Sequence, residues 1–372
     1  MTGPSRYLTE HAAILPATVP FTGPEALERV RGAKFKARLG ANESGFGPAP
    51  SVIEAMQEAV LGNWMYADPE SFELRQAVAQ HHGVGVDNVV IGEGIDGLLG
   101  LTCALFLAPG ETVVTSDGAY PTFNFHVAGH AGRLVKVPYR DDKEDLAALL
   151  EAARQEKAKI LYVSNPDNPM GSWWTADEIG QLIANLPDET LLLLDEAYCE
   201  TAPEGTLPPI DTGNGQVIRY RTFSKAYGMA GARIGYCLGA EELIKPFDKV
   251  RNHYGINRLG QVAALAAIKD QAYLRDAVGR IAAARQRIAE IATVNGLQPL
   301  ASATNFVAID CGRDSAYARR ILEETLKRDV FIRMPGVEPL SRCIRVSTSQ
   351  PDEIELFGSV LPEAIKAAAQ GK

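Results

Sequence analysis

Short apolar runs alternate with amphipathic stretches through the first two thirds of the chain. Apolar residues spaced by three and four positions predict helices, as over 52–60. Runs that are apolar throughout, such as 160–163, predict strands covered on both faces. The alternation indicates an α/β domain with a mostly parallel sheet. The expected strands are 89–91, 112–115, 134–137, 160–163, 191–194 and 217–223, and the expected helices are 52–60, 69–81, 96–107, 123–129, 145–153 and 175–184, the last with a capping box at Thr175 and Glu178.

The pattern changes after about residue 239. Two long helical regions, 241–251 and 260–292, are followed by shorter units of mixed type. This change predicts a second, smaller α+β domain, to which the N-terminal segment returns. We therefore expect a large domain over 40–250 and a small domain that combines 1–39 with 251–372. The shorter units are 305–310, 316–327 and 343–347.

Composition and charge narrow the class of protein. The 372 residues are 46% apolar and 22% charged, and 37 basic against 46 acidic residues leave a net charge of −9. An acidic chain disfavours nucleic acid as a partner. The five cysteines contain no C-x-x-C pair, which is typical of reduced thiols. No apolar run is long enough to cross a membrane and no secretory signal is visible, so we expect a cytoplasmic protein with no membrane partner. A metal site at His81 and His82 is not expected.

Candidate chemistry follows the predicted strands, because ligands of open α/β sheets bind beyond the carboxyl ends of the strands. The glycine-rich segment 92–97 precedes a helix and is either an anion site or a tight turn. Asp195 ends a run of leucines and is either a helix cap or a buried carboxylate that needs a cation.

A lysine and an arginine follow the next strand. Lys225 is either a solvated side chain or an amine whose pKa is lowered by burial and which forms Schiff bases. Arg233, in a segment rich in glycine, suits a phosphate. A phosphate loop, a carboxylate, a lysine and an arginine at the ends of strands of one sheet together suit a phosphorylated heterocycle bound through an imine.

Four ordered motifs carry a family resemblance. They are N-P-x-N-P-x-G at 165–171, D-E-A-Y at 195–198, T-F-S-K at 222–225 and G-x-A-G-x-R-I-G-Y at 228–236. With them the chain resembles the class I and II pyridoxal-phosphate-dependent aminotransferases of fold type I. It is most similar to their histidinol-phosphate subfamily, also at 39–44, 66–69, 331–333 and 343–345.

The resemblance implies a role for each matching residue. Lys225 would hold pyridoxal 5'-phosphate covalently and move the proton of the reaction, while Asp195 would keep the ring nitrogen protonated. Tyr198 and Asn168 would bond the ring oxygen, and Phe123 would stack on the ring. The phosphate would be bound by the turn of Gly94, Ile95 and Asp96, by Ser224 and Arg233, and by Tyr66 of a second subunit in a homodimer with shared active sites.

The resemblance also implies a substrate site. Arg345 would bind the α-carboxylate of the amino donor, Asn168 would lie beside it, and Arg333 would bind a distal anion. Phe21 stands where histidinol-phosphate enzymes carry a tyrosine that reaches the substrate phosphate, so one hydrogen bond is missing. The expected donor is histidinol phosphate or a bulky or aromatic amino acid, and the acceptor is a 2-oxo acid such as 2-oxoglutarate.

Two alternatives remain open at this point. A pyridoxal-phosphate-dependent decarboxylase or lyase, similar to the threonine-phosphate decarboxylases, would carry closely similar motifs. A regulator that retains an aminotransferase-like domain as a sensor would need a DNA-binding module. The chain has no additional basic N-terminal domain for that role.

Overall fold

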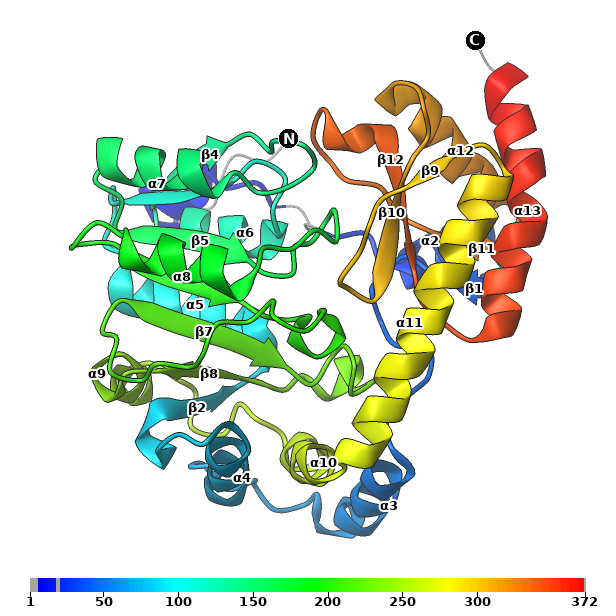
Figure 1. Cartoon of the computed structure of the whole chain (residues 1–372). Helices are drawn as coiled ribbons and strands as arrows, with labels where there is room; N and C mark the ends of the chain where they lie inside the picture. Colours follow the sequence, from blue (N-terminus) through cyan, green and yellow to red (C-terminus); the bar gives the residue numbers. More distant parts are fainter. Residues whose placement is uncertain (1–5, 18–20, 371–372) are drawn as a thin grey trace.

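The computed structural model describes residues 6–17 and 21–370 and contains a seven-stranded sheet (Figure 1). The strand order is β2-β8-β7-β6-β5-β3-β4, and β8 runs opposite to the other six strands. The predicted mostly parallel α/β architecture is therefore confirmed, although β8 itself was not predicted because its segment is rich in glycine. The strands are β2 (Val89–Gly92), β3 (Thr112–Ser116), β4 (Arg133–Val137), β5 (Ile160–Ser164), β6 (Leu191–Asp195), β7 (Val217–Thr222) and β8 (Gly235–Gly239).

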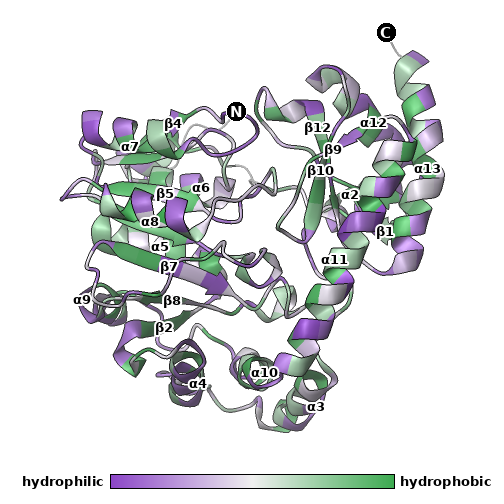
Figure 2. Ribbon diagram, viewed as in Figure 1, coloured by the Kyte–Doolittle hydropathy of each residue, from purple (hydrophilic) through white to green (hydrophobic). Residues whose placement is uncertain are grey.

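Helices cover both faces of this sheet. Successive side chains of a strand point to opposite faces, so Ile160 and Tyr162 pack with α5 (Gly94–Phe106) and α6 (Pro121–Gly129). Leu161 and Val163 pack with α7 (Leu146–Gln155) and α8 (Ala176–Ala184) on the other face. Figure 2 shows the strands coloured as apolar and the outer helices with polar stretches, which is why these strands lack the alternation of a half-exposed sheet.

The N-terminal segment returns to the C-terminal region as expected. Strand β1 (Ala37–Arg38) pairs in parallel with β11 (Val330–Phe331), and β12, β10 and β9 form a three-stranded antiparallel sheet. Leu39 and Phe357 belong to the apolar core of this smaller unit. Its other elements are α2 (Pro24–Arg31), β9 (Gln298–Pro299), β10 (Phe306–Asp310), α12 (Ser315–Lys327), β12 (Cys343–Ser347) and α13 (Pro351–Gln370).

The expected helical region 260–292 is two helices. Asp270 ends α10 (Arg258–Lys269), and its side chain accepts a hydrogen bond from Tyr273 N at the start of α11 (Gln271–Val294). Helix α10 packs against α3 (Pro50–Ala59) and α4 (Phe72–His82) of the large domain. We therefore propose that the domain boundary lies within α11, which runs from one unit to the other in Figure 1, and not at residue 251.

The segment after β8 is less regular than expected. The expected helix 241–251 is a short helix α9 (Glu241–Ile244) followed by a 3-10 turn that contains Pro246. A further short helix, α1 (Glu10–Ile14), lies near the N-terminus, where His11 Nε2 is 2.7 Å from the carbonyl oxygen of Ala128. All five cysteines are free and buried. Within 6–17 and 21–370, no helix combines the length and apolarity needed to span a membrane.

Candidate active site

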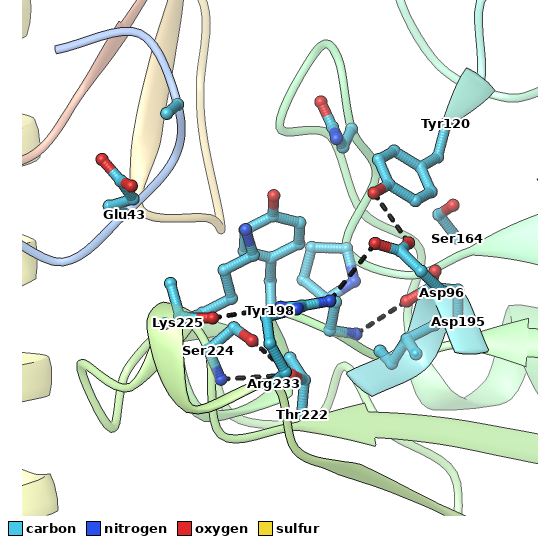
Figure 3. A pocket seen from close by; sticks show the side chains of 17 residues that line it. Glu43, Asp96, Tyr120, Ser164, Asp195, Tyr198, Thr222, Ser224, Lys225 and Arg233 are labelled. Atoms are coloured by element: carbon cyan, nitrogen blue, oxygen red, sulfur yellow. Dashed lines mark hydrogen bonds and ion pairs between the residues drawn. The ribbon is translucent and has the colours of Figure 1, made fainter. Parts of the chain in front are cut away.

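Two adjoining cavities open at the carboxyl ends of the parallel strands. The first, of about 330 Å³, is lined by eight of the predicted site residues (Figure 3). The second, of about 390 Å³, contains the remaining substrate candidates and shares Lys225, Asn168 and Tyr120 with the first. The first cavity is lined by Ile95, Asp96, Asn168, Asp195, Tyr198, Ser224, Lys225 and Arg233, and the second also by Phe21, Arg333 and Arg345.

Lys225 follows β7 in a tight turn. Its Nζ donates a hydrogen bond to the carbonyl oxygen of Asn42, at 3.2 Å. Burial lowers the pKa of Lys225 to about 8, and the positive charge of Arg345 acts in the same direction. Gly228 allows this turn to lie against the 41–47 segment, because it has a φ of +70° and a Cβ there would be 2.2 Å from the oxygen of Gly47. The site therefore contains a lysine that loses its proton readily.

Asp195 ends β6 and is 5% exposed. Its Oδ2 accepts a hydrogen bond from the Tyr162 hydroxyl at 2.6 Å, and its Oδ1 accepts one from Ala197 N at 2.9 Å. Burial raises its pKa to about 6, although both hydrogen bonds oppose that change. No described lysine, arginine or histidine forms a salt bridge with it. Of the two alternatives for Asp195, the structure thus shows the buried carboxylate, which still needs a cation.

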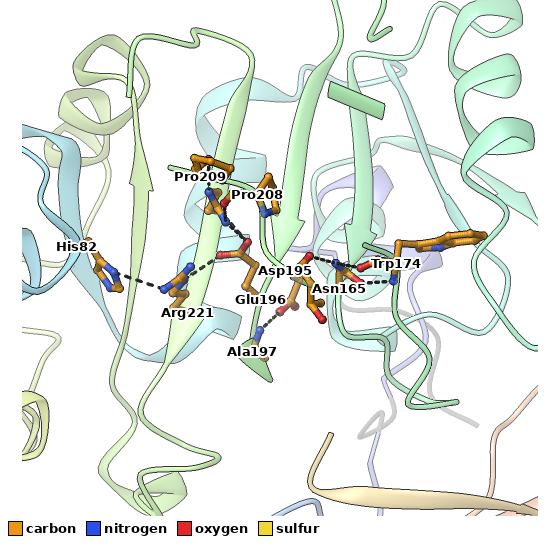
Figure 4. A network of polar contacts seen from close by, with 11 residues as sticks. His82, Asn165, Trp174, Asp195, Glu196, Ala197, Pro208, Pro209 and Arg221 are labelled. Carbon is orange, nitrogen blue, oxygen red and sulfur yellow. Dashed lines mark hydrogen bonds and ion pairs between the residues drawn. The ribbon is translucent and has the colours of Figure 1, made fainter. Parts of the chain in front are cut away.

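The next residue, Glu196, anchors the end of β6 on the opposite side. Figure 4 shows Asp195 and Glu196 directed away from each other. Glu196 is fully buried and accepts hydrogen bonds from Arg219 Nε at 2.9 Å and Arg221 Nε at 2.8 Å. Burial raises the pKa of Glu196, but the two arginines outweigh it and lower the pKa. Arg221 in turn lies near His82, whose pKa burial lowers to about 3. This paired network fixes the strand end that carries Asp195.

The predicted phosphate loop is built at the start of α5. Gly94 has a φ of +76°, and a Cβ there would be 2.7 Å from Arg233 Nη2, so this position requires glycine. Arg233 Nη2 lies 3.4 Å from Asp96 Oδ2, and Asp96 Oδ1 accepts a hydrogen bond from the Tyr120 hydroxyl at 2.8 Å. Helix-terminal N–H groups beside a guanidinium are suited to an anion.

The second cavity places two arginines side by side. Arg345 on β12 donates from Nη1 to Asn168 Oδ1 and exchanges backbone hydrogen bonds with Arg333. Burial lowers the pKa of Arg345 to about 10. Arg333 Nη2 donates to the carbonyl oxygen of Thr22 at 2.8 Å, and its guanidinium lies 5.6 Å from the Phe21 ring centroid. Both arginines carry a buried Nε without a partner among the described residues.

Two of the predicted cofactor residues lie elsewhere. Phe123 is fully buried in the core of the large domain, stacks on Tyr162 with ring centroids 4.4 Å apart, and lines neither cavity. The stacking role expected for it is therefore wrong in this structure, and Tyr120, three residues earlier, lines both cavities. Tyr66 is 78% exposed and packs on Tyr254, away from the site of its own chain.

Asn42 is the functional candidate that the sequence analysis missed. Its Nδ2 donates to the Tyr198 hydroxyl at 3.1 Å, and its carbonyl oxygen accepts from Lys225. Ser347 Oγ donates to Asn42 Oδ1, and Asn305 Nδ2 donates to the Asn42 carbonyl oxygen. The signal that was available is the asparagine within the 39–44 motif, which the analysis quoted without a role.

Comparison with known proteins identifies the family. The model of the class I and II aminotransferases matches residues 35–357, and the chain belongs to that family. It is accordingly a pyridoxal-phosphate-dependent aminotransferase, and the comparisons give no support to the decarboxylase alternative.

The relatives define the subfamily more closely. Histidinol-phosphate aminotransferase 1 of Mesorhizobium japonicum is 35% identical over 96% of this chain and 98% of its own length. Histidinol-phosphate aminotransferase of Moorella thermoacetica is 31% identical over 93% and 90%. A crystal structure of histidinol-phosphate aminotransferase from Sinorhizobium meliloti in complex with pyridoxal-5'-phosphate has a TM-score of 0.95 and 55% identity, and the match covers 97% of this chain and 98% of that one.

Proposed function

We propose that this enzyme transfers the amino group of histidinol phosphate to a 2-oxo acid such as 2-oxoglutarate. The observation that carries the proposal is the position of Lys225 and Asp195. They line one cavity from the ends of adjacent strands, beside two arginines, Arg333 and Arg345, that form no salt bridge with any described residue. Relatives with this activity match the chain over nearly its whole length.

The cavity fits pyridoxal phosphate. The buried carboxylate of Asp195 needs a cation, which a protonated ring nitrogen would provide. The turn at Gly94 presents backbone N–H groups next to Arg233, as a phosphate requires. Tyr120 lines the cavity and would take the ring-stacking position expected of Phe123, and Tyr198 and Asn168, which also line it, would bond the ring oxygen. When bound, the cofactor supplies a carbonyl carbon that accepts the amino group and a ring that delocalises negative charge.

Four residues of the cavity and its surroundings would have separate roles in the reaction. Lys225 would provide the amine that holds the cofactor, and its lowered pKa would let its neutral amine take the proton from the substrate Cα. Asp195 would keep the ring nitrogen protonated. Asn42 orients the Tyr198 hydroxyl. Arg345 donates a hydrogen bond to Asn168, which lines the cavity together with Lys225, and it would bind an α-carboxylate or a comparable anion.

Histidinol phosphate, the proposed donor, carries a phosphate group in addition to its amine. Arg333 and Arg345 offer two guanidinium groups in one cavity, enough for a phosphate dianion. A second candidate donor, a bulky or aromatic amino acid, is favoured by the aromatic wall that Phe21 forms with Tyr120, with ring centroids 6.3 Å apart. The loss of a hydroxyl at Phe21 weakens phosphate binding without removing either arginine.

The enzyme also works as a homodimer in this proposal. Tyr66 would bind the cofactor phosphate in the site of the other subunit, since it does not reach the site of its own chain. Positions near Tyr66 in the sequence also expose apolar side chains, which would be covered in the dimer; Trp64, for example, is 83% exposed. The others are Val60, Leu61, Met65 and Phe72, together with Tyr254, on which Tyr66 packs.

A direct assay tests the proposed function. Purified enzyme with pyridoxal phosphate, histidinol phosphate and 2-oxoglutarate should form glutamate, and the Lys225→Ala variant should form none. Phenylalanine in place of histidinol phosphate measures the second candidate. Release of carbon dioxide from amino acids without glutamate formation, or no turnover of either donor, would contradict the proposal.

A further inference from the structure

Tyr162 makes a short hydrogen bond to the carboxylate that faces the cofactor cavity. Its hydroxyl lies 2.6 Å from Asp195 Oδ2. The strand register explains the contact, because Tyr162 is opposite Leu193 on the adjacent parallel strand and Asp195 is two residues further along the same face. A tyrosine is long enough to reach this diagonal neighbour. Among the described residues, no other side chain donates to Asp195.

The ring of Tyr162 is held firmly in this position. It is fully buried, and Phe123 stacks on it with an angle of 18° between the two rings. Packed interiors leave little room for another rotamer. Phe123 therefore contacts Asp195 only indirectly, through Tyr162. The sequence resemblance, by contrast, assigned Phe123 to the cofactor itself.

The charged groups around Asp195 explain why the hydrogen bond from the Tyr162 hydroxyl matters. Asp96 on α5 and the buried acids Glu144 and Asp167 are all close enough to influence this cluster, while the positive charges of Lys225 and Arg345 act on Asp195 and Asp167, respectively. Burial raises the pKa of Asp195, whereas the hydrogen bond from Tyr162 lowers it. The hydroxyl therefore favours the ionised carboxylate in surroundings that otherwise favour the neutral acid.

We propose that Tyr162 is a positioning residue that holds the Asp195 carboxylate toward the ring nitrogen of the cofactor, with Phe123 packed behind it. The inference rests on the proposed function, since it assumes that pyridoxal phosphate occupies the cavity. It assigns to Tyr162 and Phe123 a part in the reaction although neither lines the cavity.

The test compares two tyrosines of the same core. Tyr162→Phe removes the hydroxyl that bonds Asp195. Tyr220→Phe is the matched control, because Tyr220 is equally buried, belongs to the same core, and bonds Thr102 Oγ1 at 2.7 Å. Both proteins are loaded with pyridoxal phosphate labelled with ¹⁵N in the ring, and the nitrogen resonance reports its protonation. In Tyr162→Phe the resonance should move toward the unprotonated value and kcat should fall about tenfold, with KM changed less than about twofold. Tyr220→Phe should match the wild type in both.

A double-mutant cycle shows whether Tyr162 acts through Asp195. In an Asp195→Asn background, Tyr162→Phe should cause no further change in kcat. Should Tyr162→Phe fold poorly, Phe123→Leu keeps the hydroxyl but frees the ring, and it should give a smaller shift of the nitrogen resonance in the same direction.

The outcomes separate this inference from the proposed function. A wild-type resonance in both Tyr162→Phe and Phe123→Leu, or a fall in kcat no larger than in Tyr220→Phe, would overturn the inference alone. A wild-type protein that takes up no pyridoxal phosphate would overturn the proposed function and the inference with it.

Discussion

Asn42 Nδ2 lies 3.1 Å from the hydroxyl of Tyr198, although the two residues are separated by 156 positions in sequence. The backbone of Asn42 also bonds Ser347 and Asn305 of the small domain and Lys225 of the large domain. Its side chain, which bonds Tyr198 and accepts a hydrogen bond from Ser347 Oγ, likewise connects both domains. Asn42 has a φ of 55°, a conformation that asparagine tolerates better than most residues.

Replacing Asn42 should therefore damage catalysis more than folding. Asn42→Ala leaves the Tyr198 hydroxyl without its donor, and kcat/KM should fall by about tenfold, the worth of one hydrogen bond of about 1.4 kcal/mol. Asn42→Gly is the matched control, since glycine accepts the positive φ but also lacks the side chain. Full activity in the glycine variant and loss in the alanine variant would show that backbone conformation, and not the hydrogen bond, is what matters.

The buried carboxylate of Asp195 should cost the cofactor-free protein stability. Its folded pKa is about 6 against 3.8 for the free group, so the cost is present above pH 6 and disappears as the pH falls toward 3.8. At pH 7, Asp195→Asn should have a free energy of unfolding about 1–3 kcal/mol higher than the wild type. This gain in stability should vanish near pH 4. Urea titrations across this range measure it, with the exposed Asp188→Asn as control. A difference that does not change with pH would rule out this account.

Phe21 should set the balance between the two candidate donors. A tyrosine there would restore a hydroxyl near Arg333, and a charge-assisted hydrogen bond is worth about 1.5–3 kcal/mol, or roughly tenfold to hundredfold in affinity. In the wild type we expect phenylalanine or another bulky donor to match or exceed histidinol phosphate in kcat/KM. Phe21→Tyr should shift the ratio toward histidinol phosphate, while Phe21→Leu should not. A wild-type preference for histidinol phosphate above about a hundredfold would refute the argument.

Tyr66 should act across the subunit interface. Tyr66→Ala and Lys225→Ala are each expected to be inactive or severely impaired, but mixed and re-associated subunits form one site that contains both native residues. Activity should recover to about a quarter of the wild-type value for random pairing in a two-fold dimer. Light scattering checks the assembly, and an active monomer would exclude a shared site.

The sequence predicted most of the sheet because its strands are buried on both faces and are apolar throughout. It did not predict β8, where glycines indicated a loop, or the break at Asp270, which a continuous helical pattern conceals. The candidate residues predicted at strand ends line one cavity, because parallel strands bring their carboxyl ends together.

Long-range contacts account for the errors. Phe123 was assigned to the cofactor, but its ring packs inward on Tyr162, and nothing local indicates which face of α6 points to the cavity. Glu144 lies in an acidic stretch before α7, yet it is 1% exposed and accepts a hydrogen bond from Ser164 N of β5, a contact that its neighbours in sequence do not indicate. Asn42 bonds Tyr198 of the large domain and Ser347 of the small domain, and these contacts between residues far apart in sequence form only in the folded chain.

The central claim is that Lys225 is the attachment point of pyridoxal phosphate. Enzyme loaded with the cofactor and treated with borohydride keeps the cofactor fixed to the lysine that bears it, and peptide mass spectrometry identifies that residue. The account predicts a single modified lysine, Lys225, and no fixed cofactor in Lys225→Ala even at equal cofactor concentration. Modification of another lysine, or an unmodified Lys225 in active enzyme, would contradict it.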